Sequence, residues 1–183
     1  MASGLLTSCR GWLRVSPLRT SPATTGWTHR RSLRSPPGRS DGETADLGDL
    51  WFFLDRGLGS VVVPGALRAR RWQLTTMDER YGPERSQYVG DADWIGDAAR
   101  RGEVLLCKDR AIARGPAEAM AVNLNDARVF ALAHAGVTGP DMADLFLAAE
   151  RAIVRMACRA TGPYVVSVSR DGLRRLRLAY PPS

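Results

Sequence analysis

Residues 51–55 have the sequence Trp-Phe-Phe-Leu-Asp, a short apolar run that ends in an acid and is followed by Gly57 and Gly59. A second run, at residues 104–109, has the same form, because Val-Leu-Leu-Cys precedes Lys-Asp. Short apolar runs bounded by turn residues are typical of parallel strands that are buried on both faces. These two runs decide the fold class, since a parallel sheet needs a layer of helices on each side.

Further strands and a hairpin follow along the chain. The additional strands are predicted at residues 72–77, 127–133, 164–169 and 173–178. The last two are joined by Arg170-Asp171-Gly172, a turn sequence, which predicts a C-terminal β-hairpin.

Helical patterns lie between these strands. One helix is predicted after Ser60 as its N-cap, and a second begins with Asp91 as its cap and ends near Gly102. A third, long helix is predicted from Thr138 to Gly162. Strand followed by helix, repeated in this way, indicates a three-layer α/β/α sandwich with a mostly parallel central sheet and the C-terminal hairpin.

Residues 1–47 differ in composition from the rest. The first forty residues contain seven Arg, seven Ser, five Thr and four Pro, and the first acidic residue is Asp41. Such a segment buries too little apolar surface to offset its ordering entropy. We therefore predict a disordered Arg/Ser/Pro-rich tail at 1–47 and one α/β domain at 48–183. A transit peptide has similar composition, but a single Lys among 26 basic residues favours a high-G+C bacterium and a start codon assigned too far upstream.

The sequence excludes several classes of protein. No stretch approaches the ~20 apolar residues that span a bilayer, so no membrane association is expected. Three scattered Cys and two His are too few for a disulfide framework or a Cys/His zinc site, and they predict a reducing, cytoplasmic compartment. The dinucleotide-binding fingerprint fails at Val62, and neither a P-loop nor a nucleophile elbow occurs.

Acidic residues at the strand ends indicate where the chemistry lies. Asp55 and Asp109 each follow a buried strand, and ligands of open α/β sheets bind beyond the carboxyl ends of the strands. If the two strands are neighbours, both carboxylates enter one crevice, and Asp91 at its helix start could join them. Carboxylates this close need a cation or a proton between them. Hard oxygen ligands without His or Cys suit Mg²⁺ or Mn²⁺, which can activate water for attack on a phosphodiester.

Each acid also has an ordinary structural explanation. Asp55 before two glycines is a typical turn residue, and Asp91 fits a helix N-cap. Asp109 could form a solvated ion pair with Lys108 or Arg110. The spacing of the acids leaves both interpretations open.

Four short motifs occur in an order known from one group of proteins. They are Phe53-Leu54-Asp55-Arg56-Gly57-Leu58-Gly59, Asp78-Glu79-Arg80-Tyr81, Asp91-Ala92-Asp93-Trp94-Ile95 and Lys108-Asp109-Arg110-Ala111-Ile112. With them, the chain from about 51 to 178 resembles the PIN-like domains of VapC-type toxins. The resemblance implies a PIN-like α/β/α nuclease fold, metal-dependent RNA cleavage and a toxin–antitoxin setting. A small antitoxin protein would be the partner, and a homodimer is left open.

The resemblance also assigns site residues by position. The metal-binding and catalytic acids would be Asp55, Asp91 and Asp109, and Asp78 or Glu79 would be a fourth metal ligand. The Glu that often follows the first Asp in related PIN-like proteins is replaced here by Arg56, which bears on the number of metal ions.

Basic residues near the third acid suggest contacts to RNA. Three of them could hold phosphates, namely Lys108, Arg110 and Arg114. The last strand could extend this track with Arg174, Arg175 and Arg177. An Arg-rich composition alone gives the alternative of an ordinary solvated surface. No base-stacking aromatic or base-reading module is evident in the sequence.

Three hypotheses follow. The first is a Mg²⁺- or Mn²⁺-dependent endoribonuclease of PIN-like fold, acting as the toxin of a toxin–antitoxin system. The second is a non-catalytic PIN-like domain that binds RNA or protein, and the third is an α/β domain whose acids are only caps and turns. The first requires Asp55, Asp91 and Asp109 to converge.

Overall fold

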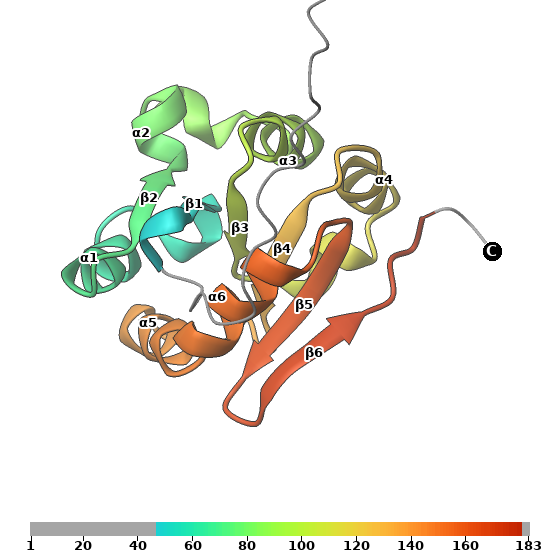
Figure 1. The fold of residues 1–183 in the computed structure, drawn as a ribbon. Helices are drawn as coiled ribbons and strands as arrows, with labels where there is room; N and C mark the ends of the chain where they lie inside the picture. Colours follow the sequence, from blue (N-terminus) through green and yellow to red (C-terminus); the bar gives the residue numbers. More distant parts are fainter. Residues whose placement is uncertain (1–46, 181–183) are drawn as a thin grey trace, which may run out of the picture. The chain divides into compact units, whose positions relative to one another are not determined.

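The computed structural model describes residues 47–180, so the predicted tail lies, except for Leu47, outside the described residues. A six-stranded sheet forms the centre of this part (Figure 1). Its strands are β1 (Trp51–Leu54), β2 (Gln73–Thr76), β3 (Val104–Cys107), β4 (Arg128–Leu132), β5 (Tyr164–Ser169) and β6 (Gly172–Leu176).

The strand order is β2-β1-β3-β4-β5-β6, in which the first five strands are parallel and β6 runs antiparallel beside β5. The two strands that decide the fold are neighbours, with Phe53 opposite Leu105. Every residue of β3 and all but the first residue of β1 are buried. The burial on both faces explains why these segments are continuous apolar runs.

Helices cover both faces of the sheet (Figure 1). On one face lie α1 (Val62–Ala69), α5 (Gly139–Ala148) and α6 (Glu150–Arg159), and on the other lie α2 (Met77–Tyr81), α3 (Asp91–Arg100) and α4 (Pro116–Leu124). Short 3₁₀ turns connect these elements: η1 (Leu47–Asp49), η2 (Arg56–Leu58), η3 (Arg85–Gln87) and η4 (Arg110–Ala113). The predicted three-layer α/β/α sandwich with a C-terminal hairpin is confirmed.

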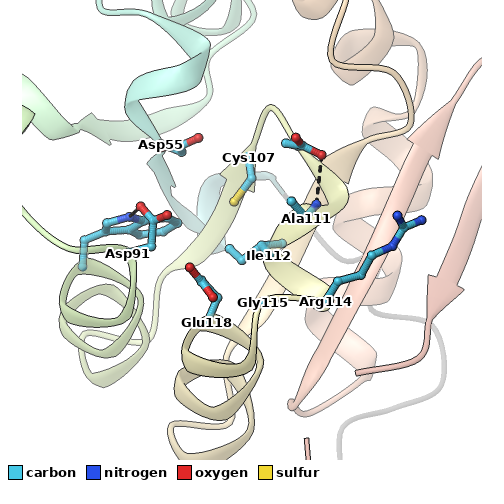
Figure 2. Close-up of a pocket in the computed structure, with 10 residues that line it drawn as sticks. Asp55, Asp91, Cys107, Ala111, Ile112, Arg114, Gly115 and Glu118 are labelled. Atoms are coloured by element: carbon cyan, nitrogen blue, oxygen red, sulfur yellow. Dashed lines mark hydrogen bonds between the residues drawn. The ribbon is translucent and has the colours of Figure 1, made fainter. Parts of the chain in front are cut away.

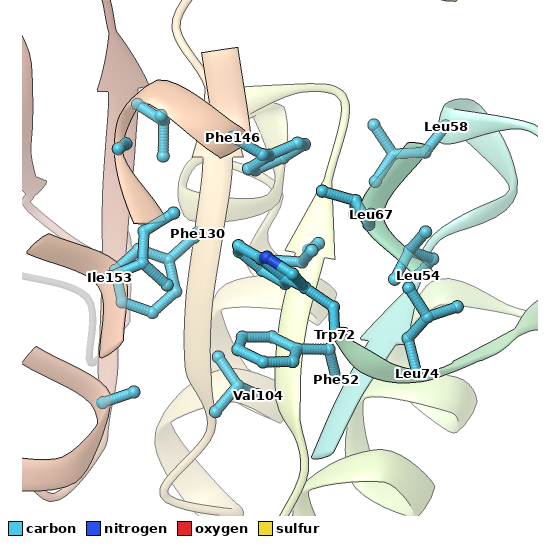
Figure 3. Close-up of a cluster of buried hydrophobic side chains, with 14 of the residues drawn as sticks. Phe52, Leu54, Leu58, Leu67, Trp72, Leu74, Val104, Phe130, Phe146 and Ile153 are labelled. Atoms are coloured by element: carbon cyan, nitrogen blue, oxygen red, sulfur yellow. The ribbon is translucent and has the colours of Figure 1, made fainter. Parts of the chain in front are cut away.

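Successive residues of β1 supply the two halves of the core, because side chains alternate across a strand. Phe52 packs toward α1, α5 and α6, where its ring centroid lies 4.4 Å from that of Trp72 (Figure 3). Phe53 packs on the opposite face, with its centroid 5.7 Å from that of Trp94 on α3. The sheet is therefore held between two separate apolar layers.

The predicted long helix is wrong in one respect. The chain forms two helices, α5 and α6, which are separated at Ala149 by a backbone with φ −91° and ψ 0°. The apolar stripe continues across this break, since Phe146 and Ile153 both enter the same core layer. Periodicity reports which side is buried and is insensitive to a break of one residue. The predicted start is confirmed, because the Thr138 side chain accepts a hydrogen bond from the backbone N–H of Asp141.

Several predicted element ends are also wrong. The N-cap of α1 is Val61 and not Ser60, and the N-cap of α3 is Gly90 and not Asp91. The second strand stops at Thr76, whose side chain forms a capping box with Glu79 and starts α2. Helix α4 has no predicted counterpart, because its sequence carries apolar residues on all sides. No helix in the described part of the chain is long and apolar enough to cross a membrane.

Candidate active site

The candidate site lies where β1 and β3 end. Helix α1 leads from β1 to β2 on one side, whereas β3 lies on the other side of β1, so the strand order reverses between β1 and β3. Such a reversal opens a crevice at the carboxyl ends of the strands, where open α/β sheets bind ligands. Asp55 occupies this edge, and its backbone N–H donates to the carbonyl of Leu106 in β3 at 3.0 Å.

A cavity of about 420 Å³ opens at this edge (Figure 2). Its polar wall contains four carboxylates, from Asp55, Asp91, Asp109 and Glu118. The structure thus brings the three acids predicted from the sequence into one cavity, although they come from the end of β1, the start of α3 and the loop after β3.

The carboxyl of Asp55 is the most enclosed of these acids. Burial raises its pKa above the ordinary value of 3.8, and the charge of Asp91 adds to this effect. Hydrogen bonds from the backbone N–H groups of Gly57 and Lys108, together with the Arg56 charge, oppose it. Gly57 must lack a side chain here, because a Cβ would lie 2.9 Å from Oδ2 of Asp55. A negative charge on Asp55 is therefore held in a confined position that a cation would stabilise.

Asp91 is held through one of its two carboxylate oxygens. Its Oδ1 accepts hydrogen bonds from Trp94 Nε1 at 3.0 Å and from Arg56 Nη2 at 3.4 Å. Both contacts fall on the same oxygen, so Oδ2 is left for a ligand in the cavity. This use of the side chain explains why Asp91 is the first residue of α3 and does not cap it.

Asp109 combines a structural role with its place in the cavity. Its Oδ1 accepts a hydrogen bond of 2.9 Å from the backbone N–H of Ala111 and thereby caps η4. None of the ion pairs within residues 47–180 involves Asp109, so the proposed pairing with Lys108 or Arg110 is not seen there. Capping leaves the second carboxylate oxygen available to a ligand.

Glu118 is the acid that the sequence analysis missed. It lies in the first turn of α4, and in Figure 2 its carboxylate points from that helix toward Asp91 and Cys107. A Cβ on Gly115 would collide with this carboxylate, so the glycine makes room for its position. The available signal was Gly115-Pro116 followed by an acid, a pattern that is typical of a helix start.

Cys107 forms the floor of the cavity between these acids. It is buried, and the pKa of its thiol is raised well above the ordinary value, chiefly by burial and then by the charges of Asp55 and Asp91. The thiol therefore stays protonated at neutral pH and adds no charge to the site. The anionic donors of the cavity are all carboxylates.

The two candidates for a fourth ligand lie elsewhere. Asp78 lines a smaller, adjoining cavity of about 160 Å³ together with Asp55 and Arg56, and it accepts a 2.6 Å hydrogen bond from Ser86 Oγ. Glu79 lines neither cavity, because its carboxylate caps α2 and forms an ion pair with Arg68 at 2.6 Å. Of the two, only Asp78 shares a cavity with one of the other acids, Asp55.

The carboxylate donors fit a hard divalent ion that keeps part of its water shell. Within residues 47–180, no group of three His, Cys, Asp or Glu side chains lies close enough to hold one ion. Mg²⁺ is usually bound by one or two carboxylates, with water and phosphate oxygens in its other positions. The arrangement therefore suits such an ion better than one enclosed entirely by protein ligands.

The predicted basic residues are dispersed around the site. Arg114 lines the main cavity, whereas Lys108 and Arg110 flank Asp109 without lining it. The predicted extension along the last strand is wrong for Arg175, which donates to the carbonyl of Pro163 at the amino end of β5, away from the acids. Arg114 is thus the cation best placed to receive a phosphate.

Comparison with known proteins agrees with this geometry. Residues 51–134 match a family model described as a PIN like domain. A curated protein of Mycobacterium tuberculosis, "Putative ribonuclease VapC45", is 38% identical over 124 residues, which cover 68% of this chain and 89% of that protein. No solved structure gives a significant match.

Proposed function

Since the chain belongs to the PIN-like domain family, in its VapC-type group, we propose that it is a metal-dependent endoribonuclease whose active site is the cavity of Asp55, Asp91 and Asp109. The observation that carries this proposal is the convergence of these three acids, from separate elements, at the β1/β3 edge. An acid that served only as a cap or a turn residue would have no reason to line the same cavity as the other two.

Ribonucleases of the PIN family generally use divalent metal ions. We propose that Asp55, Oδ2 of Asp91 and the second oxygen of Asp109 would hold Mg²⁺ or Mn²⁺, directly or through water. The bound ion would supply activation of a water molecule and neutralisation of charge on the leaving oxygen. Arg56 places a positive charge beside Asp55 and Asp78 in the smaller cavity, which favours one ion in the larger cavity over a second ion near Asp78.

The chain's own residues would then orient the RNA. Arg114 on the cavity wall is placed to pair with a phosphate, and Lys108 and Arg110 would bind neighbouring phosphates. Burial of Asp55 keeps bulk water from screening its charge, which strengthens its attraction for a cation in the cavity.

The test is cleavage of single-stranded RNA with Mn²⁺, with and without EDTA. We expect Asp55→Asn, Asp91→Asn and Asp109→Asn each to lower the rate by orders of magnitude while the protein stays folded. Asp144→Asn, on an exposed position of α5, is the matched control and should cleave like the wild type. Cleavage that persists in EDTA, or that survives in Asp109→Asn, would contradict the proposal.

A non-catalytic PIN-like domain that binds RNA or protein is the second candidate. It is favoured by the absence, within residues 47–180, of three acids close enough to share one ion. The same assay separates the two, because wild-type protein that binds RNA without cutting it in any metal would support the binding domain.

VapC-type ribonucleases in general act on RNA and pair with an antitoxin. We extend this to the chain and propose a toxin role, a small antitoxin as partner and a cytoplasmic location, with homodimerisation as an open part of the proposal. Induced expression should arrest bacterial growth for the wild type and for Asp144→Asn, and it should not do so for Asp109→Asn. Growth arrest by all three proteins would show that toxicity does not depend on the acid cavity.

A further inference from the structure

Tyr88 is the most exposed large hydrophobic side chain in residues 47–180, with 89% of its surface accessible. It follows η3 in the loop that leads to α3. In Figure 1 this loop lies at the upper edge, between α2 and α3. An aromatic ring in water gains nothing for folding, since burial is what makes such rings stabilising. The fold therefore gives no reason for a tyrosine at this position.

The backbone on both sides of Tyr88 is tied down. The Arg56 guanidinium donates to the carbonyls of Ser86 at 3.0 Å, Gln87 at 2.8 Å and Val89 at 3.2 Å. The N–H of Tyr88 itself donates to the carbonyl of Arg85 at 3.0 Å. The ring is thus held on an ordered loop. Because the loop backbone is already fixed, a ligand that stacks on the ring would bind with little loss of backbone entropy.

This loop also borders the acids. The residue that holds it, Arg56, directly follows Asp55, and Gln87 shares the smaller cavity with Asp55. Three residues after Tyr88 the chain reaches Asp91, whose Oδ1 is bound by the same Arg56 guanidinium. The backbone at Tyr88 thus lies between a residue that lines the smaller cavity and an acid that lines the main cavity, while its ring projects into solvent and lines neither cavity.

We propose that Tyr88 stacks on a base of single-stranded RNA and positions the strand across the acid cavity. The inference rests on the proposed function, which places RNA at this cavity. Exposed aromatic rings bind unpaired bases by stacking, whereas the base faces of a duplex are covered by their neighbours. The occupant is therefore single-stranded RNA, and an aromatic platform supplies the base contact that was not evident from the sequence alone.

The experiment measures binding and cleavage separately for Tyr88→Ala, Tyr88→Phe and Tyr88→Leu. Affinity for a fluorescently labelled single-stranded RNA is measured by anisotropy in EDTA, where no cleavage is needed, and steady-state cleavage is measured with Mn²⁺. Leu124→Ala, an exposed apolar residue at the far end of α4 from Glu118, is the matched control. Melting temperatures should be unchanged throughout, because both side chains face solvent.

We expect Tyr88→Ala to bind roughly 5- to 150-fold more weakly, the range for loss of one base–aromatic stack. Tyr88→Phe should restore affinity to within about twofold of the wild type, because it keeps the ring and loses only the hydroxyl, whereas Tyr88→Leu should not. The loss should appear in KM more than in kcat, and affinity for double-stranded RNA should not change.

The outcomes distinguish this inference from the function on which it rests. If the wild type binds single-stranded RNA through Tyr88 but does not cleave it, the stacking role of Tyr88 would stand and the proposed nuclease activity would be overturned. If the wild type cleaves RNA and Tyr88→Ala changes neither the RNA affinity nor KM, the stacking role of Tyr88 alone would be overturned. Unchanged RNA affinity together with a change in oligomeric state, measured by light scattering, would assign Tyr88 to contact with a second copy and also overturn it. Wild-type protein that neither binds single-stranded RNA nor cleaves it with Mn²⁺ would overturn both.

Discussion

Arg56 Nη2 lies 3.4 Å from Oδ1 of Asp91, so the residue that follows one acid of the cavity holds another acid in place. The same guanidinium binds three carbonyls of the loop before α3. Two parts of the site that are 35 residues apart in sequence are joined by one side chain. The Arg that departs from the family pattern after the first Asp therefore has a defined role here, as a positioning residue for Asp91.

Replacing Arg56 tests this role. Arg56→Lys keeps the charge but loses the planar fork that reaches several acceptors, so we expect the free energy of unfolding to fall by about 1–3 kcal/mol. Mn²⁺ affinity, measured by calorimetry, should also fall, because Asp91 is less well oriented. Arg68→Lys, which removes a surface contact to Glu79, is the control for general loss of an arginine and should leave Mn²⁺ affinity unchanged. Unchanged Mn²⁺ affinity in Arg56→Lys would show that Asp91 is positioned without it.

Asp55→Asn should stabilise the metal-free protein at neutral pH. Burial above all, with the charge of Asp91, raises the pKa of Asp55 in the folded state above its ordinary value of 3.8. The unfolded chain then ionises first as the pH rises, and the wild type loses stability from about pH 4 up to the folded pKa. The gain in melting temperature of Asp55→Asn should therefore be absent below about pH 4, grow as the pH rises, and be complete above the folded-state pKa of Asp55.

Bound metal should reverse the difference in stability between the wild type and Asp55→Asn. Added Mn²⁺ should raise the melting temperature of the wild type, because it binds the folded state, and it should have little effect on Asp55→Asn. A stability difference between the two proteins that does not change with pH would show that Asp55 is not strained by its burial.

Glu118 is expected to support the ion without contributing to stability. Glu118→Gln should lower Mn²⁺ affinity about 10-fold, as for a residue that acts on an ion through water, with little change in melting temperature. Glu84→Gln, at an exposed position outside both cavities, is the control. Gly115→Ala should have the same effect as Glu118→Gln, because the added Cβ displaces the flexible carboxylate at small cost to the fold. Effects on affinity that add fully in the double variant would argue against this shared cause.

Phe146 tests the core of the opposite face. Its side chain is fully buried in the layer formed by α1, α5 and α6 (Figure 3), so Phe146→Ala should lower the free energy of unfolding by about 3–5 kcal/mol. Leu124→Ala, at 65% exposure, should change it by less than about 1 kcal/mol in chemical denaturation. A small effect at Phe146 would mean that α5 is not packed on the sheet in solution.

The fold class and two of the cavity acids could be predicted from local sequence. A strand buried on both faces must be apolar throughout, and its polar end residue must leave the sheet at the carboxyl edge. Asp55 and Asp109 are therefore recognisable as edge residues before any contact is known. Asp91 was recognisable as a helix start that could join them, and the PIN-like resemblance assigned it to the same site.

Sequence by itself determined which segments are strands, which acids end them and which helical faces are apolar, because these depend on the two- and 3.6-residue periods of the backbone. Only the tertiary structure decided that Arg56 binds Asp91, that Glu118 enters the acid cavity and that Tyr88 is exposed on the loop before α3. These three facts concern side chains in loops and at the starts of helices, and no local period reports which distant residues such side chains approach. The strand order, which sets β3 beside β1, is what brings those loops together.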